Sequence, residues 1–498
     1  MRGKEVPLSF RSTKNKGEKG NLVDNDSSLR EAAVASMAEI FLAGARGAAD
    51  FAAFEDAAIA AGHSMMAEAM GRALEARDAE LAAGRPAGLR MRDRRERTLA
   101  TEVGDVSFSR CRYAGEEGAV YLLDDALDLP WGARVSPGAA AFLVTAGTMA
   151  SYARTASLLA RRGSSVSATA VMACLRSAGA LCAEEDEAAA DALYSDGVVP
   201  AAERAREALL VEADGTFLSL QRPAEGEPRR VELKAMVAYE GKERRGRKVV
   251  RVAPFHHALV GTAGELWSQG VAAMGRRWDL SRLESVHLGG DGEPWCSALG
   301  AWLPRAEVVF HLDPFHVNRA ILAALPDKRL AGRLIGLVRD GGKEAAVALL
   351  KGCLSQGLAR PRAGAAAVGY LEGNLGSVAV AGPSLGTMES DNPPLYGARV
   401  DSVPCGWSRA GACDMGRLIS RRESGRAVPR MTRELSASPR RRRRREARER
   451  RSLERAGTRA SEVVQSVGSG YEPPHRARVG RMAPLVSLAA GLDSGMAF

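Results

Sequence analysis

The sequence contains few of the cysteines and histidines that form disulfides in small secreted proteins or bind zinc in small zinc modules. Its seven cysteines are an odd number, none belongs to a CxxC pair, and there are only seven histidines. A disulfide framework or a cysteine-based zinc site needs paired or closely spaced ligands. The cysteine pattern therefore predicts reduced thiols and a protein of the cytoplasm.

Long apolar runs are also missing. The longest nearly uncharged stretch, residues 136–155, is interrupted by Pro137 and is rich in small residues. The N-terminus shows no basic segment followed by an apolar one. A membrane span needs about 20 apolar residues, and a secretion signal needs that N-terminal order, so neither is predicted. A length of 498 residues, 46% of them hydrophobic, instead predicts a globular protein of two or three domains.

A net positive charge is missing from the chain except at its C-terminal end. Residues 426–498 contain 17 arginines, no lysine and 7 acidic residues, and this difference equals the whole net charge of +10. Any DNA contact by the rest of the chain must therefore come from local basic patches. The tail, with its arginine run at 440–445, is predicted to be disordered. Two interpretations of it stay open, a solvated extension and a DNA-binding arm.

The region from residue 28 to residue 200 is predicted to be mainly helical, after a disordered stretch over residues 1–27. Ser28 and Glu31 form a capping-box pattern before two Ala-rich helices that break near residues 44–49. A small strand pair is predicted over residues 101–113 and 120–123.

Two short helical patterns, residues 152–161 and 168–176, fit either a helix-turn-helix or an ordinary helical hairpin. Ser167 is a favourable N-cap for the second helix. If the motif is a helix-turn-helix, basic side chains orient it on DNA phosphates. The DNA-binding residues predicted here are Arg154, Arg161, Arg162 and Arg176. A polar acidic stretch at 184–187, a further helix and a domain boundary at Pro200 are expected to follow.

Residues 201–425 mix strands and helices in an α/β order. Strands are predicted at 209–213, 231–237, 249–252, 286–290 and 308–313, with a helix at 264–277 and two amphipathic helices within 327–354. Asp214 and Asp291 each follow an apolar strand and precede a glycine. A carboxylate in that position can face a shared ligand without being buried unpaired. Two such carboxylates and a third from elsewhere would form an all-oxygen site for magnesium or manganese.

Several short sequence blocks, each present once, follow one another in a characteristic order between residues 30 and 422. They comprise segments 211–215, 232–234, 239–241, 290–292, 312–318 and 407–412, with Trp295, Tyr370, Leu371, Asn374 and Met415. In their order and spacing, these blocks resemble the ISLre-type bacterial insertion-sequence transposases, members of the DDE superfamily.

The resemblance implies an RNase H-like mixed sheet whose triad is Asp214, Asp291 and Glu389, with a helical insert at about 320–365 before the glutamate. It further implies two Mg²⁺ or Mn²⁺ ions, with Asp214 bridging both and the other two carboxylates holding one each. Glu372 and Asp391 stay open as alternatives to Glu389, because prolines follow Glu389 closely. Asp313 and His316 are secondary candidates, and His316 could contact a phosphate or pack against Phe315.

The implied chemistry is in-line displacement at phosphorus, in which two metal ions about 4 Å apart offset the charge on the attacking and leaving oxygens. The leading hypothesis is a DNA transposase that binds double-stranded element ends as a dimer or larger homo-oligomer, in the cytoplasm at the nucleoid. The alternatives are an RNase H-like nuclease without strand transfer and a non-catalytic DNA-binding protein on a decayed or domesticated scaffold.

Overall fold

The computed structural model describes residues 23–115, 118–223, 225–374, 376, 385, 393–400, 406–433 and 435–436. Glu389, Asp391, the predicted disordered stretch up to residue 22 and the arginine run at 440–445 lie outside them. Within the described ranges, no helix combines the length and apolar character that crossing a membrane requires.

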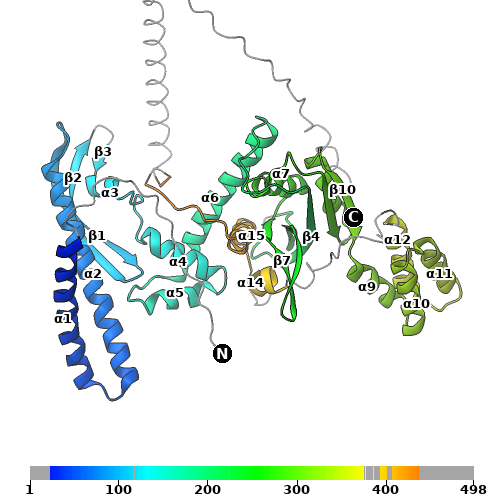
Figure 1. Ribbon diagram of the computed structural model, residues 1–498, viewed down its shortest axis with the longest axis horizontal. Helices are drawn as coiled ribbons and strands as arrows, with labels where there is room; N and C mark the ends of the chain where they lie inside the picture. Colours follow the sequence, from blue (N-terminus) through cyan, green and yellow to red (C-terminus); the bar gives the residue numbers. More distant parts are fainter. Residues whose placement is uncertain are drawn as a thin grey trace, which may run out of the picture.

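A long helical hairpin, α1 (Val23–Gly47) and α2 (Phe51–Ala83), projects from one end of the molecule (Figure 1). The break between the helices lies where it was predicted, and Asp50 caps α2 by accepting a hydrogen bond from Ala53 N at 2.8 Å. The predicted capping box at Ser28 is wrong, because α1 begins at Val23 and contains Ser28.

An antiparallel sheet of β1 (Arg90–Thr101), β2 (Gly104–Gly115) and β3 (Gly118–Val120) lies beside the hairpin. The prediction located β2 but not β1, whose arginine-rich sequence is largely exposed and shows no apolar alternation. The predicted strand pair is present, because β3 pairs with β2 through Val120 and Tyr113, but its second strand ends at Val120 and α3 (Leu122–Ala126) follows. The N-terminal region is therefore less purely helical than predicted.

Three further helices, α4 (Pro137–Gly147), α5 (Tyr152–Ala160) and α6 (Ala168–Tyr194), lead to the central part of the molecule. Ser167 caps α6 as predicted, accepting from Ala170 N at 3.1 Å. The predicted end of this helix near residue 176 is wrong, since α6 is a single uninterrupted helix of 27 residues that ends at Tyr194. The acidic stretch at 184–187 lies within the helix, because arginines of other elements pair with its carboxylates.

The central unit is a mixed α/β structure around a five-stranded sheet in the order β10-β9-β4-β5-β8. Strands β4, β8, β9 and β10 run in one direction, and β5, which lies between β4 and β8, runs antiparallel to both of these neighbours. The bounds are β4 (Ala208–Ser219), β5 (Arg230–Tyr239), β8 (Phe255–Leu259), β9 (Ser285–Gly290) and β10 (Glu307–Leu312). The strand predicted at 249–252 belongs instead to a separate hairpin of β6 (Gly241–Arg245) and β7 (Lys248–Val252). Strand β8 was not predicted, because its two adjacent histidines are polar and interrupt the apolar pattern of a buried strand.

Helices cover both faces of this sheet. Helix α7 (Ala263–Met274) packs on one face, through a core that includes Val211, Met236 and Leu288. Helices α6 and α15 (Arg409–Glu423) pack on the other face, against alternate residues of β5. The shorter elements α8 (Pro294–Ser297) and η1 (Ala298–Trp302) follow β9, and η3 (Pro393–Gly397) and α14 (Ala398–Val400) precede α15.

Four helices between β10 and η3 form a module with its own apolar core, which projects at the opposite end from the α1–α2 hairpin (Figure 1). They are α9 (Pro314–Ala324), α10 (Lys328–Arg339), α11 (Lys343–Ser355) and α12 (Pro361–Gly373). The two amphipathic helices predicted within 327–354 are confirmed as α10 and α11.

A buried ion network holds α6 against α15. Asp186 of α6, whose side chain is 2% exposed, lies 3.3 Å from Arg417, 2.7 Å from Arg421 and 3.1 Å from Arg426. Burial by itself raises the pKa of Asp186, but His257 and the three arginines together hold that pKa below its ordinary value. The Asp186 carboxylate is therefore charged, and it forms ion pairs with all three arginines at once.

Beyond α15 the chain returns to the N-terminal region. Arg433 forms an ion pair with Asp125 and a second with Asp124 at 3.5 Å, and its guanidinium lies 3.7 Å above the ring of Trp131. Asp124 also pairs with Arg97 and Arg110, both at 2.9 Å. The buried carboxylate of Asp124 thus joins strands β1 and β2 to the end of the described chain.

Stability is expected to fall as the pH drops from 7 to 5. Burial, the largest cause, lowers the pKa of both His256 and His257 to about 3, and neighbouring arginines add to the effect. Unfolding lets both rings bind protons near pH 6.5, so the unfolded state gains roughly 1.4 kcal/mol per pH unit for each histidine below that pH. Urea unfolding at pH 7 and pH 5 measures the loss. A midpoint that does not change between these pH values would contradict the prediction, and His256→Gln should reduce the pH dependence.

Candidate active site

Asp214 and Asp291 lie at the same height on two neighbouring parallel strands. Glu212 of β4 pairs with Gly289 of β9, and this is the last pair between the two strands. Each aspartate lies two residues beyond that pair, on the same face of the sheet as the paired residue. The sequence prediction that both would meet at one edge of the sheet is consistent with this register.

The local backbone differs from the prediction at one of the two aspartates. Asp214 does not end its strand, because β4 continues to Ser219 and pairs with β5 throughout. Gly215 accordingly has no positive φ. A side chain at Gly215 would instead collide with the carboxylate of Glu232. Gly292, after the second aspartate, does take a positive φ of 95° in a turn, as expected.

A third aspartate continues this row on β10. Leu312 pairs with Gly290, and the next residue, Asp313, donates its backbone N–H to Gly290 O at 2.8 Å. Asp313 is 9% exposed and caps α9, accepting from Phe315 N at 2.9 Å. Asp313 was only a secondary candidate in the sequence, yet its position after a strand end was the same signal that marked Asp291.

The buried thiol of Cys296 lies beside the first two aspartates of the row. Cys296 Sγ lies 3.5 Å from Asp291 Oδ1 and 3.8 Å from the carbonyl oxygen of Ala213. Burial raises the pKa of this thiol strongly, and the charges of Asp291 and Asp214 raise it further. Both aspartates therefore influence the ionisation of one buried thiol.

Two glutamates enlarge this acidic region. Trp295 Nε1 donates to Glu232 Oε1 at 3.2 Å, and Glu232 also forms an ion pair with Lys234. Burial, Asp291 and Glu232 all raise the pKa of Glu293. Glu232 and Lys234 were not predicted as site residues, although their alternation on β5 places both on one face of the strand.

The donor set suits a hard cation such as Mg²⁺ or Mn²⁺, which prefers carboxylate oxygens. Among the residues that the structure describes, no three His, Cys, Asp or Glu side chains converge closely enough to hold a metal ion. Asp291 Oδ1 instead accepts a hydrogen bond from Glu293 N at 3.0 Å. The third predicted ligand, Glu389, lies outside the described residues.

The helical module contacts the site through Tyr370 of α12, whose hydroxyl donates to Asp291 O at 2.7 Å. Burial raises the pKa of Tyr370, and Asp291 and Asp313 raise it further. Glu372, an alternative third ligand, is exposed and pairs with Lys351 at 2.6 Å. Two residues along a helix separate Glu372 from the Tyr370 face, so the structure gives this alternative no support.

His316 of α9 is half-buried next to the acidic region. Its Nδ1 lies 3.0 Å from Arg319 Nη2, and its ring meets that of Phe315 edge-on at 5.5 Å between centroids. Of its two predicted roles, packing against Phe315 is the one the structure displays.

The four arginines predicted to bind DNA are in two different situations. Arg154 and Arg161 are exposed on α5 and at its end. Arg162 pairs with Glu102 and lies 4.4 Å above the ring of Phe142. Arg176 pairs with Asp414 at 2.6 Å, which ties it to α15. The first two are thus available to a ligand, whereas the other two have partners within the chain.

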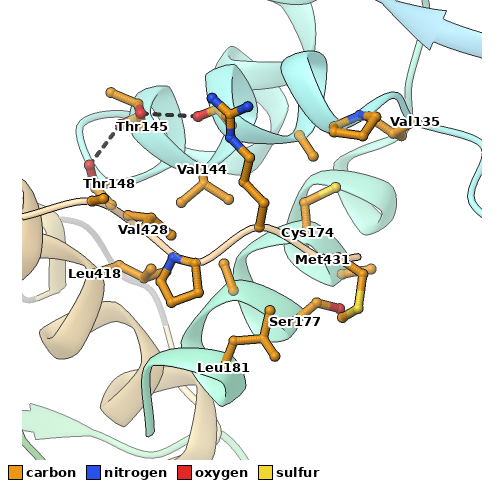
Figure 2. A pocket seen from close by; sticks show the side chains of 18 of the residues that line it. Val135, Val144, Thr145, Thr148, Cys174, Ser177, Leu181, Leu418, Val428 and Met431 are labelled. Atoms are coloured by element: carbon orange, nitrogen blue, oxygen red, sulfur yellow. Dashed lines mark hydrogen bonds between the residues drawn. The ribbon is translucent and has the colours of Figure 1, made fainter. Parts of the chain in front are cut away.

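A separate groove of about 660 Å³ lies between α4, α6, α15 and the segment 425–431 (Figure 2). Apolar side chains including Val144, Leu181, Leu418 and Val428 line it, and no acidic residue does. This groove therefore offers nothing to a cation and is distinct from the carboxylate row.

These features define a mixed α/β protein with a row of aspartates at the edge of its central sheet. The chain belongs to the uncharacterised protein family UPF0236, whose pattern matches residues 51–352, more than half of the chain.

Relatives of the chain occur in Caldanaerobacter subterraneus subsp. tengcongensis. UPF0236 protein TTE2489 is 24% identical over 260 residues, which are 50% of this chain and 50% of the relative. Another UPF0236 protein, also 24% identical over 253 residues and half of each chain, carries a name that joins eleven loci, from TTE0033 to TTE2212. The chain thus spans about half the length of the curated relatives it matches.

Proposed function

We propose that the protein is a DNA transposase of an insertion sequence, with an RNase H-like catalytic domain that cleaves DNA and transfers strands with the help of divalent metal ions. The observation that carries the proposal is the register of the sheet, which brings Asp214 and Asp291 to the same height on adjacent strands. The strand order β10-β9-β4-β5-β8, with β5 as the one reversed strand, is the order that an RNase H-like sheet requires.

The relatives supply separate support. One UPF0236 protein is encoded at eleven loci of one genome. Such multiplicity is what repeated insertion of a mobile element produces. A housekeeping enzyme gains no evident advantage from so many copies.

In the proposed mechanism, Asp214 and Asp291 bind the metal ions jointly with Glu389. The ions, when bound, activate the attacking hydroxyl and stabilise the leaving oxygen. Tyr370 holds the backbone of Asp291 through its hydrogen bond. Cys296 donates to the carboxylate of Asp291 and so fixes its orientation. Lys234, paired with Glu232 beside this acidic surface, would meet a DNA phosphate.

The decisive experiment incubates the purified full-length chain with DNA that contains the ends of its element, with and without Mg²⁺, and resolves the products on a denaturing gel. Joined products support a transposase. Cleavage without joining would identify a nuclease, and binding without cleavage would identify a non-catalytic DNA-binding protein.

Deleting residues 438–498 is expected to weaken the salt dependence of non-specific DNA binding. Each lost phosphate contact reduces the slope of log K against log salt by about 0.9, and most of the 17 arginines of the C-terminal part lie in the deleted segment. Fluorescence anisotropy over a range of salt concentrations measures the slope. Replacing only the run at 440–445 by glutamine is the matched control for chain length. An unchanged slope would show that the tail does not touch DNA.

A further inference from the structure

The α1–α2 hairpin has almost no core of its own. From residue 27 onward no residue of α1 is buried, and the buried residues of α2 are only Gly62, Ala67, Gly71 and Asp78. The loop end of the hairpin projects clear of the three-stranded sheet (Figure 1). Helices in proteins draw most of their stability from packing an apolar face. This hairpin is therefore short of packing partners within its own chain.

Three large apolar side chains form a stripe along the exposed side of α2, here called the α2 stripe. Ile59, Met66 and Met70 are 48%, 43% and 44% exposed. Spacings of seven and four residues place them on one side of the helix. Methionine is common at surfaces that adapt to a partner. The α2 stripe thus has the composition of a helix interface, although none of the residues that the structure describes covers it.

Gly62 leaves a hollow beside the α2 stripe, and no described residue fills this hollow. A glycine inside a helix weakens the helix. At Gly71 the reason is visible, because a Cβ there would lie 2.5 Å from Ser107 O of β2. At Gly62 a Cβ would have no heavy atom within 4 Å, even though the residue is shielded from solvent. The hollow has room for a side chain of another molecule.

Nucleic acid does not fit as the partner of the hairpin. Residues 23–83 contain eleven acidic residues and four arginines. This excess of negative charge repels a phosphate backbone. The partner of the α2 stripe is therefore a protein surface.

We propose that the α2 stripe packs against the α2 stripe of a second copy of the chain, with the two helices antiparallel about a two-fold axis at Met66. Met70 and Gly62 lie at equal distances on either side of Met66, so the Met70 of each copy enters the Gly62 hollow of the other. Ile59 faces Ala73 in the same way. Large side chains meet small ones at these levels on either side of the Met66 pair, as interdigitating helices require.

Charge fixes the direction of this pairing. Glu55 and Arg77 also lie at equal distances from Met66, so the antiparallel dimer contains the Glu55–Arg77 pair twice. The Arg77 side chain is 52% exposed and within reach of a partner. A parallel arrangement would oppose like charges at both positions, which disfavours it. The proposal is independent of the proposed function, because it is tested by molecular mass and not by DNA cleavage.

Sedimentation velocity of the full-length chain over a range of concentrations tests the proposal. The unmodified chain is expected to form dimers. Met66→Glu places two carboxylates together on the axis, and Gly62→Leu fills the hollow, so each should raise the dimer dissociation constant by roughly thirtyfold or more. Leu29→Glu, at an exposed apolar site on α1, is the matched control and should leave the constant unchanged. Circular dichroism checks that each variant is folded.

A charge exchange gives the sharper test. Glu55→Arg alone and Arg77→Glu alone oppose like charges at both ends of the dimer, and each should raise the dissociation constant roughly tenfold. A mixture of these two variants forms heterodimers in which both pairs are complementary again, so dimerisation should return on mixing. The double variant should dimerise like the original chain.

Three results would overturn the proposal. One is a chain that stays monomeric at every soluble concentration. Another is a dimer whose dissociation constant is unaffected by Met66→Glu and Gly62→Leu. The last is a monomer that dimerises only after residues 437–498 are deleted, since the arginine-rich tail would then be what covers the stripe.

Discussion

Asp214→Asn and Asp291→Asn are each expected to abolish Mg²⁺-dependent DNA cleavage while DNA affinity stays within a few-fold. Both substitutions keep the shape of the side chain and remove the charge that a hard cation needs. Metal ions supply several kcal/mol to such reactions, and each 1.4 kcal/mol changes the rate about tenfold, so the loss should be on the order of a thousandfold. Cleavage of end-containing DNA, followed on a denaturing gel, measures the rate.

The matched control for these variants is Asp279→Asn, which changes an exposed turn residue that caps Ser281 and lies outside the carboxylate row. Glu389→Gln should behave like the two aspartate variants. If Glu389→Gln retains activity and Asp391→Asn loses it, the third ligand is Asp391 and the mechanism stands. Cleavage at the original rate by both Asp214→Asn and Asp291→Asn would show that the two-metal mechanism is wrong.

Asp186→Asn is expected to lower the free energy of unfolding by about 3–5 kcal/mol, the usual cost of removing one partner from a buried ion pair. Asp186 faces Arg417, Arg421 and Arg426, and the first two have side chains that are 6% and 2% exposed. Once the carboxylate is neutral, these guanidinium groups lose the buried charge they share. Urea denaturation monitored by circular dichroism measures the change.

Asp191→Asn is the control for this variant, because Asp191 lies on the same helix and is exposed. Its effect should be within about 0.5 kcal/mol, as for most surface substitutions. If Asp186→Asn were as stable as this control, the network would contribute nothing net to folding.

The sequence located elements best where local signals agreed. The helix predicted at 264–277 is found as α7, whose apolar face is buried. Asp291 was found because a buried strand, a carboxylate and a glycine with positive φ follow one another.

The sequence failed where distant residues determine the local structure. The acidic stretch in α6 resembled a loop because nothing local showed that Arg417 and Arg421 would neutralise it. Gly215 resembled a turn residue, whereas the carboxylate of Glu232 on the next strand is what requires a glycine there. Asp313 was only a secondary candidate, because pairing between β9 and β10 is not visible in either strand alone.

The position of Arg433 has a consequence for the order in which the protein is made. Its partner Asp124, together with Arg97 and Arg110, emerges from the ribosome some three hundred residues earlier. Until Arg433 has been translated, the Asp124 cluster lacks one of its three arginines, and until α15 has been translated one face of the central sheet lacks its cover. A reading-frame error anywhere before residue 409 therefore leaves the earliest part of the product unfinished as well as the latest. A frame change after residue 436 would leave both contacts intact.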